Sequence, residues 1–137
     1  MVNTLRLEIV TPLEKVYSED VQRVVLPGIE GEMGIYPMHI PVMTEIKPGD
    51  LRILKDGVET DYAVGEGFVE ITQTHVTVLT DMAIEESLID EHAVEHAIER
   101  ARAALRNTEA MNAEEIATTE GTLQKSLVQL RLKRHKR

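Results

Sequence analysis

Cysteine is absent from this chain of 137 residues, and aromatic residues make up only 3% of it. Without cysteine the protein can form neither a disulfide scaffold nor a thiolate metal site. A hydrophobic core therefore has to be built from aliphatic side chains. Hydrophobic residues account for 42% of the chain, which is enough to supply such a core.

Long apolar runs are also missing. None approaches the roughly 20 residues that a membrane-spanning helix needs. The first ten residues, MVNTLRLEIV, lack the charged segment and apolar block of a signal peptide. We therefore expect no direct insertion into a membrane.

Positive charge is scarce until the end of the chain. The net charge is −9, yet residues 121–137 contain six Lys or Arg and no Asp or Glu. The acidic remainder would repel nucleic acid and anionic lipid, and we predict no nucleic-acid partner. The basic end could bind an acidic surface, or it could simply complement the dipole of a helix that ends there.

The first eighty residues have the pattern of short strands. Leu5, Leu7 and Ile9 alternate with polar residues, which is the period of a strand with one buried face. Asp56-Gly57 predicts a hairpin turn, and residues 67–81 predict a second hairpin that turns near Gln73 and Thr74. This spacing is typical of an antiparallel sandwich or barrel.

Proline is absent after residue 90, and Gly121 is the only glycine there. Apolar residues then recur with helical spacing, and Ser87 or Asp90 could cap the start of a helix that Asn107 ends. The apolar face of this first helix comprises Val94, Ala97, Ile98, Ala101, Ala104 and Leu105.

A second helix is predicted after Asn112, which forms a capping-box pattern with Glu115. Its apolar seam comprises Ile116, Leu123, Leu127 and Leu130. The two helices would form an antiparallel hairpin with a thin apolar contact, because alanine buries little area. We therefore expect a β domain over residues 1–86 and a loosely held helical domain over residues 87–137.

Glycine and proline gather in residues 26–41, LPGIEGEMGIYPMHIP. The stretch is not a phosphate-binding loop, because it lacks the Gly-Lys-Ser/Thr ending and contains Glu30 and Glu32, which would repel phosphate. Its composition alone indicates a set of tight turns at the edge of a sandwich.

A second pattern, HAVEH, brings His92, Glu95 and His96 into the His-x-x-Glu-His arrangement of some zinc proteases. Such a site needs a third protein ligand and a cleft, and neither is evident here. A free-standing zinc- or ligand-binding module is therefore the alternative hypothesis, and polar residues on the solvent side of a helix are the ordinary interpretation. No nucleophile with a base and an orienting group is evident, so we predict no catalytic residues and no cofactor.

Residues 30–53, EGEMGIYPMHIPVMTEIKPGDLRI, resemble the signature of the epsilon subunits of F-type ATP synthases, which are called delta in mitochondria. The resemblance continues through VTVLTDMAI and a helical end with QLRLKR, over nearly the whole chain. Two departures appear: Met38 replaces the usual glycine, and IPVMT replaces APLLT.

The resemblance implies a ten-stranded antiparallel β-sandwich followed by a two-helix hairpin. It implies a non-catalytic rotor subunit at the foot of the central stalk, on the gamma subunit and the ring of c subunits. The complex would lie at the cytoplasmic face of the inner membrane and be driven by protons or sodium. The expected contact residues are Glu30, Gly31, Glu32, His39, Pro41 and Met43.

The resemblance also implies a regulatory role for the helices. Opened along the shaft, they would inhibit ATP hydrolysis by bringing basic residues to an acidic segment of the beta subunits in the alpha/beta head. These residues are Lys125, Arg131, Lys133 and Arg134, with Lys136 and Arg137 beyond them. In some relatives the hairpin binds ATP, but here Ala93 stands where the motif that begins at Ile89 and Asp90 requires arginine, so we predict weak or no binding.

Overall fold

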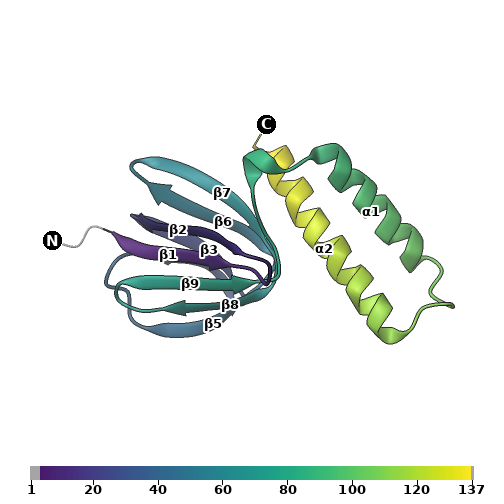
Figure 1. Cartoon of the computed structure of the whole chain (residues 1–137), viewed down its shortest axis with the longest axis horizontal. Coiled ribbons are helices and arrows are strands. Elements are labelled where there is room, and N and C mark those ends of the chain that lie inside the picture. The colour runs from purple at the N-terminus through teal and green to yellow at the C-terminus, as the bar shows by residue number, and fades with distance from the viewer. Residues whose placement is uncertain (1–3, 137) are drawn as a thin grey trace. The chain divides into compact units, whose positions relative to one another are not determined.

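The computed structural model describes residues 4–136. The chain divides into two compact units, residues 1–85 and residues 86–137. The first unit is a β-sandwich and the second consists of helices (Figure 1).

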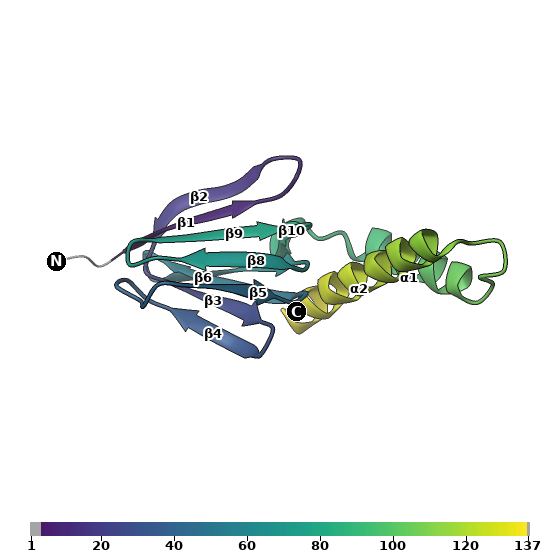
Figure 2. The ribbon, with the colours of Figure 1, turned by 90° about the horizontal axis from the view of Figure 1, so that it is seen from below.

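Ten strands make up the described part of the first unit. They are β1 (Leu5–Val10), β2 (Lys15–Val21), β3 (Arg23–Gly28), β4 (Gly31–Ile35), β5 (Val42–Ile46), β6 (Gly49–Lys55), β7 (Val58–Val64), β8 (Gly67–Ile71), β9 (His75–Thr80) and β10 (Ala83–Glu85). Along the sheet the order is β10-β7-β6-β3-β5-β8-β9-β1-β2, and β4 pairs with β3. The sheet curls on itself, as Figure 2 shows, so that its inner face encloses the core.

The predicted sandwich is confirmed, with one difference in strand direction. Every pair is antiparallel except β1 with β9, which run parallel from Arg6 opposite His75 to Val10 opposite Leu79. Alternation of apolar and polar residues sets which face of a strand is buried, but it does not set the direction of a distant partner. The expectation of a wholly antiparallel sheet was therefore wrong at this one pair.

The core is aliphatic, as the composition requires. Leu7, Ile9, Leu26, Ile35 and Leu51 are completely buried, and each such side chain contributes roughly 1.5–3 kcal/mol to folding. Both predicted hairpins are present. Asp56 and Gly57 adopt φ angles of 51° and 77° between β6 and β7, the left-handed conformation that a two-residue hairpin turn needs.

The helical unit contains the short 3-10 helix η1 (Glu86–Leu88) and the helices α1 (Glu91–Leu105) and α2 (Ala113–His135). Asp90, not Ser87, caps α1, since its Oδ1 accepts from the backbone N–H of Ala93 at 3.1 Å. The helix ends with Arg106 at the C-cap in right-handed geometry, so the expectation that Asn107 ends it was one residue late.

The capping box of α2 is present, with Glu115 N donating to Asn112 Oδ1 at 2.8 Å. The buried residues of α1 are Val94, Ile98 and Ala101, as the helical spacing predicted. On α2 the buried residues are Ser126, Val128 and Leu132, whereas the four predicted seam residues are only half-buried. Apolar residues are spread around α2, so its sequence does not define one buried face. Neither helix in the described residues is long and apolar enough to cross a membrane.

Candidate docking surfaces and basic helix end

A tight turn joins β3 to β4 and exposes Ile29 and Glu30 at its tip. Gly28 and Gly31 pair across the turn. A Cβ on Gly28 would lie 2.6 Å from the Gly31 carbonyl oxygen, and Gly31 has a φ of 132°, which strains any other residue. The conformation of this exposed turn explains why glycine recurs in residues 26–41, because these two glycines fix the shape of the turn.

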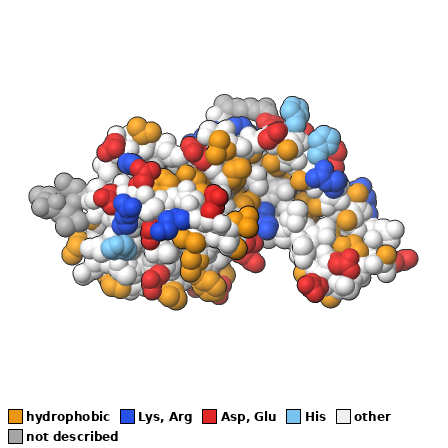
Figure 3. All heavy atoms as spheres, viewed as in Figure 1, with side chains coloured by type: hydrophobic (Ala, Val, Ile, Leu, Met, Phe, Trp, Pro, Cys, Tyr) orange, Lys and Arg blue, Asp and Glu red, His pale blue; other side chains and the backbone are white. Residues whose placement is uncertain are grey.

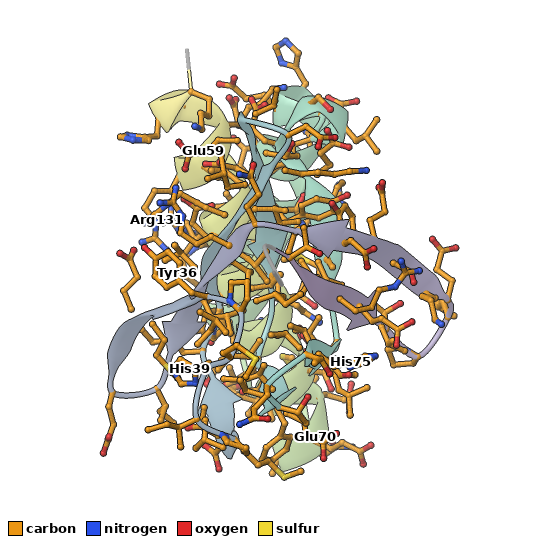
Figure 4. The ribbon with its side chains drawn as sticks, turned by 90° about the vertical axis from the view of Figure 1, so that its left-hand side faces the viewer. Tyr36, His39, Glu59, Glu70, His75 and Arg131 are labelled. Atoms are coloured by element: carbon orange, nitrogen blue, oxygen red, sulfur yellow. The ribbon has the colours of Figure 1, made fainter. Side chains whose placement is uncertain are left out.

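Exposed apolar side chains follow β4, in the loop that leads to β5 and at the start of β5 itself. We call this segment the apolar loop; it comprises Tyr36, Met38 and Ile40 of the loop and Val42 and Met43 of β5. Ile40 is 79% exposed. The backbone N–H of Met38 donates to the carbonyl of Gln73 at 2.8 Å, which anchors the loop to the β8–β9 turn. This hydrogen bond places the loop at the end of the sandwich where the β8–β9 turn lies; Tyr36, His39 and His75 are labelled in Figure 4. Such a contiguous exposed apolar surface is typical of a protein interface.

Met38 stands at the position where the resemblance leads one to expect glycine, and its φ of 68° is left-handed. The backbone therefore keeps a conformation that glycine would adopt without strain, although a methionine side chain occupies the position. That side chain is 56% exposed and adds to the apolar loop.

The six predicted contact residues do not form one surface. Glu30 and Gly31 belong to the β3–β4 turn, beside the end of β5, where Ile29 N donates to Glu45 O at 3.1 Å. His39, Pro41 and Met43 lie at or beside the apolar loop, at the other end of β4. A five-residue strand separates the two sites by roughly 17 Å.

Glu32 differs from the other five, because it is held by an ion pair. Arg52 donates to both of its carboxylate oxygens, Nη1 to Oε2 and Nη2 to Oε1, each at 3.1 Å. These hydrogen bonds hold the pKa of Glu32 below its usual value. Glu32 thus braces β4 against β6, while Glu30 stands at the exposed tip.

Exposed apolar residues on the outer face of β8 and β9 were missed by the sequence analysis. Phe68 and Leu79 face each other across these strands, and both are 53% exposed. Figure 3 shows hydrophobic side chains on this face of the sandwich. A shallow groove of about 380 Å³ adjoins them and is lined by Val10, Pro12, Gly67 and Leu79, among others. A signal was available: both residues are apolar at positions where the strand alternation calls for a polar one.

The basic end of α2 is partly engaged within the helical unit. Lys133 Nζ lies 3.5 Å from Glu86 Oε1, and Arg134 pairs with Glu91 and Glu95 at 3.3 and 3.1 Å. Arg131, labelled in Figure 4, is exposed, and Lys125 is half-buried. Arg137 lies outside the described residues.

The other two predicted motifs have structural roles in α1. In the degenerate nucleotide motif, Ile89 is buried, Asp90 is the N-cap and Ala93 is exposed. In the His-x-x-Glu-His pattern, His92 and His96 are exposed and Glu95 pairs with Arg134. Among the described residues, no three His, Cys, Asp or Glu side chains are grouped so that they could hold a metal ion.

Comparison with known proteins is decisive for the family. Residues 4–86 match the family model described as "ATP synthase, Delta/Epsilon chain, beta-sandwich domain". The ATP synthase epsilon chain of Herpetosiphon aurantiacus is 38% identical over 133 residues, which cover 97% of this chain and 96% of that one. The chain belongs to the ATP synthase delta/epsilon family. A second relative supports this assignment: the ATP synthase epsilon chain of Chloroflexus aggregans is 40% identical over 93% of this chain and 91% of its own.

Solved structures show that the family fold is kept. A chain of the Euglena gracilis mitochondrial ATP synthase OSCP/F1/c-ring complex superposes with a TM-score of 0.71 at 23% identity, covering 90% of this chain and 78% of that one. A chain of the Tetrahymena thermophila mitochondrial ATP synthase central stalk and c-ring superposes with a TM-score of 0.57 at 11% identity, covering 94% of this chain and 96% of that one. The family model and the two epsilon chains confirm the resemblance stated from residues 30–53.

Proposed function

We propose that this family member is a non-catalytic rotor subunit that couples the gamma subunit to the ring of c subunits. It would be a peripheral protein at the cytoplasmic face of the membrane, as part of a proton- or sodium-driven ATP synthase. The observation that carries the proposal is the pair of exposed, geometrically fixed surfaces at opposite ends of β4. A subunit that joins two partners needs two such surfaces on a rigid body. It is supported by the relatives, which are ATP synthase epsilon chains, and by the solved neighbours, which come from an OSCP/F1/c-ring complex and a central stalk with c-ring.

The apolar loop is proposed to bind the gamma subunit, together with His39 and Pro41. Apolar side chains that are already exposed and anchored lose little conformational freedom on binding, so most of their buried area contributes to affinity. The loop is anchored by the hydrogen bond from Met38 to Gln73, and His39 Nδ1 lies 2.7 Å from the Ile40 carbonyl oxygen.

The β3–β4 turn is proposed to face polar loops of the c-ring. Its tip presents Glu30, and the two flanking glycines fix its conformation before any contact is made. Glu32 would contribute indirectly, because its hydrogen bonds from Arg52 stiffen β4, the strand that leads from the turn.

Regulation is proposed for the helical unit. Its helices would open, reach the catalytic head and suppress ATP hydrolysis through the basic residues of α2. The thin apolar contact between α1 and α2 supports this, since each helix buries only three side chains.

The experiment that tests the function is stoichiometric purification. An affinity-tagged copy of the chain, expressed in place of the native one, should retain one gamma subunit per copy together with the several c subunits of a ring. Recovery of the folded chain without other ATP synthase subunits would contradict the proposal.

A further inference from the structure

The basic end of α2 lies against acidic residues at the start of the helical unit. Arg134 Nε is 3.3 Å from Glu91 Oε2, and Arg134 Nη2 is 3.1 Å from Glu95 Oε1. Glu91 and Glu95 are four residues apart, so they lie on the same face of α1, one turn from each other. One guanidinium therefore spans two carboxylates.

A second cation reinforces this contact. Lys133 Nζ donates to the carbonyl oxygen of Glu86 at 3.1 Å and lies 3.5 Å from the carboxylate of the same residue. We call Lys133, Arg134, Glu86, Glu91 and Glu95 the charge clasp. Its members come from both ends of the helical unit, so the clasp forms only while α2 lies folded back along α1.

The clasp is suited to hold a weak contact and to release it. Arg134 is 53% exposed, and exposed ion pairs are individually weak and screened by salt. The apolar contact beside it is small, so a few such pairs are a substantial part of what keeps the hairpin closed.

We propose that the charge clasp is a built-in autoinhibitory contact: it closes the hairpin by engaging two of the cations that α2 would offer to an acidic partner. Arg134 cannot pair with Glu91 and Glu95 and with a partner's carboxylates at the same time, so closing and partner binding compete. The clasp is a property of the chain itself, whereas its regulatory consequence rests on the proposed function.

The first test is hydrogen exchange of the α2 amides in the full chain. Arg134→Glu replaces two attractive pairs by repulsive ones and should speed exchange over the last two turns of α2 roughly tenfold. Arg131→Glu is the matched control, because it makes the same charge change one turn away. In the described residues Arg131 takes part in no ion pair. Equal exchange in the two variants would overturn the clasp.

A charge swap tests whether the pairing itself matters. Adding Glu95→Arg to Arg134→Glu should bring exchange back to within about twofold of the parent. Glu95 is chosen because Glu91 lies in the first turn of α1, where a cation is disfavoured by the helix dipole. In 0.5 M salt the parent should approach Arg134→Glu, since screening weakens the pairs. Failure of the swap to slow exchange would also overturn the clasp.

The regulatory consequence is tested separately in the reconstituted enzyme. Glu91→Gln with Glu95→Gln opens the clasp and leaves every cation of α2 in place, so ATP hydrolysis should fall severalfold below that of the parent enzyme. If exchange quickens in this variant while hydrolysis is unchanged, the clasp stands and its regulatory role fails. If neither changes, the clasp itself is refuted.

Discussion

Two glycines fix the geometry of the β3–β4 turn, and they do so for different reasons. Gly28 has no room for a side chain, whereas Gly31 has open space but a left-handed φ of 132°. Substitution at Gly31 therefore tests the conformation of the turn without creating a clash.

We expect Gly31→Val to destabilise the isolated chain by about 1–3 kcal/mol, because a β-branched residue is strained at this φ. It should also weaken assembly with the c-ring. Gly34→Val is the control, since Gly34 has no left-handed φ and a Cβ there would meet only Tyr36, at 3.7 Å. Denaturant melts give the stability, and pull-down of the complex gives the assembly. Parent-like assembly by Gly31→Val would show that the turn is not a contact.

The apolar loop allows a sharper test at one residue. Ile40 is 79% exposed, so Ile40→Asp should leave the melting temperature unchanged. Binding to gamma should weaken at least tenfold, because a buried isoleucine is worth roughly 2 kcal/mol and a buried carboxylate adds a penalty. Val58→Asp, at another exposed aliphatic residue outside the proposed surfaces, is the control. Titration of labelled gamma measures both affinities, and equal values would remove the loop from the interface.

Residue by residue, local chemistry was the part that could be predicted. Asp56-Gly57, Asn112 and Glu115 act through backbone atoms a few residues away, so their patterns are legible in the sequence. Phe68 and Leu79, which lie opposite each other on β8 and β9, were not singled out, because their pairing depends on the register of the two strands. Glu32 could not be assigned its partner, because Arg52 is twenty residues distant and is brought near only by the sheet.

The strands themselves were predicted more accurately than the pairing between them. The alternation that marks β1 is fulfilled by Leu5, Leu7 and Ile9, but nothing in it indicates β9 as a parallel partner. Likewise, the division of residues 30–43 into two sites follows from β4, a short strand that carries the chain from one end of the sandwich to the other. The direction of a strand decides which loops share an end, and that depends on tertiary pairing.

At the start of α1, the prediction of weak ATP binding acquires a structural reason. The Asp90 carboxylate already accepts a hydrogen bond from Ala93 N, and Ala93 provides no cation. We expect calorimetry on the isolated chain to detect no micromolar binding of ATP. Ala93→Arg is the comparison, since it restores a multidentate donor for phosphate at this position and should raise the affinity measurably. Micromolar affinity in the parent would contradict the prediction.

Taken as a whole, the chain combines a densely packed unit with a lightly packed one. The sandwich buries many large aliphatic side chains completely, whereas α1 and α2 together bury only Val94, Ile98, Ala101, Ser126, Val128 and Leu132. Stability in proteins is unevenly distributed, and the less stable parts are the ones that can change conformation without global unfolding. This contrast supports the proposal that the sandwich carries assembly and that the helices carry any switching.

Deleting residues 112–137 separates these two roles. The sandwich keeps its whole core, so assembly and ion-driven ATP synthesis should survive the deletion in the reconstituted enzyme. ATP hydrolysis should rise severalfold, because α2, which is long enough at 23 residues to extend roughly 34 Å, can no longer reach the catalytic head. Inhibition requires the contact of α2 with an acidic partner, so high ionic strength should narrow the difference in hydrolysis between the full-length and the truncated enzyme even though it also weakens the charge clasp. If hydrolysis is the same with and without these residues, at low and at high salt, the helices do not regulate the enzyme and the basic end only aids solubility.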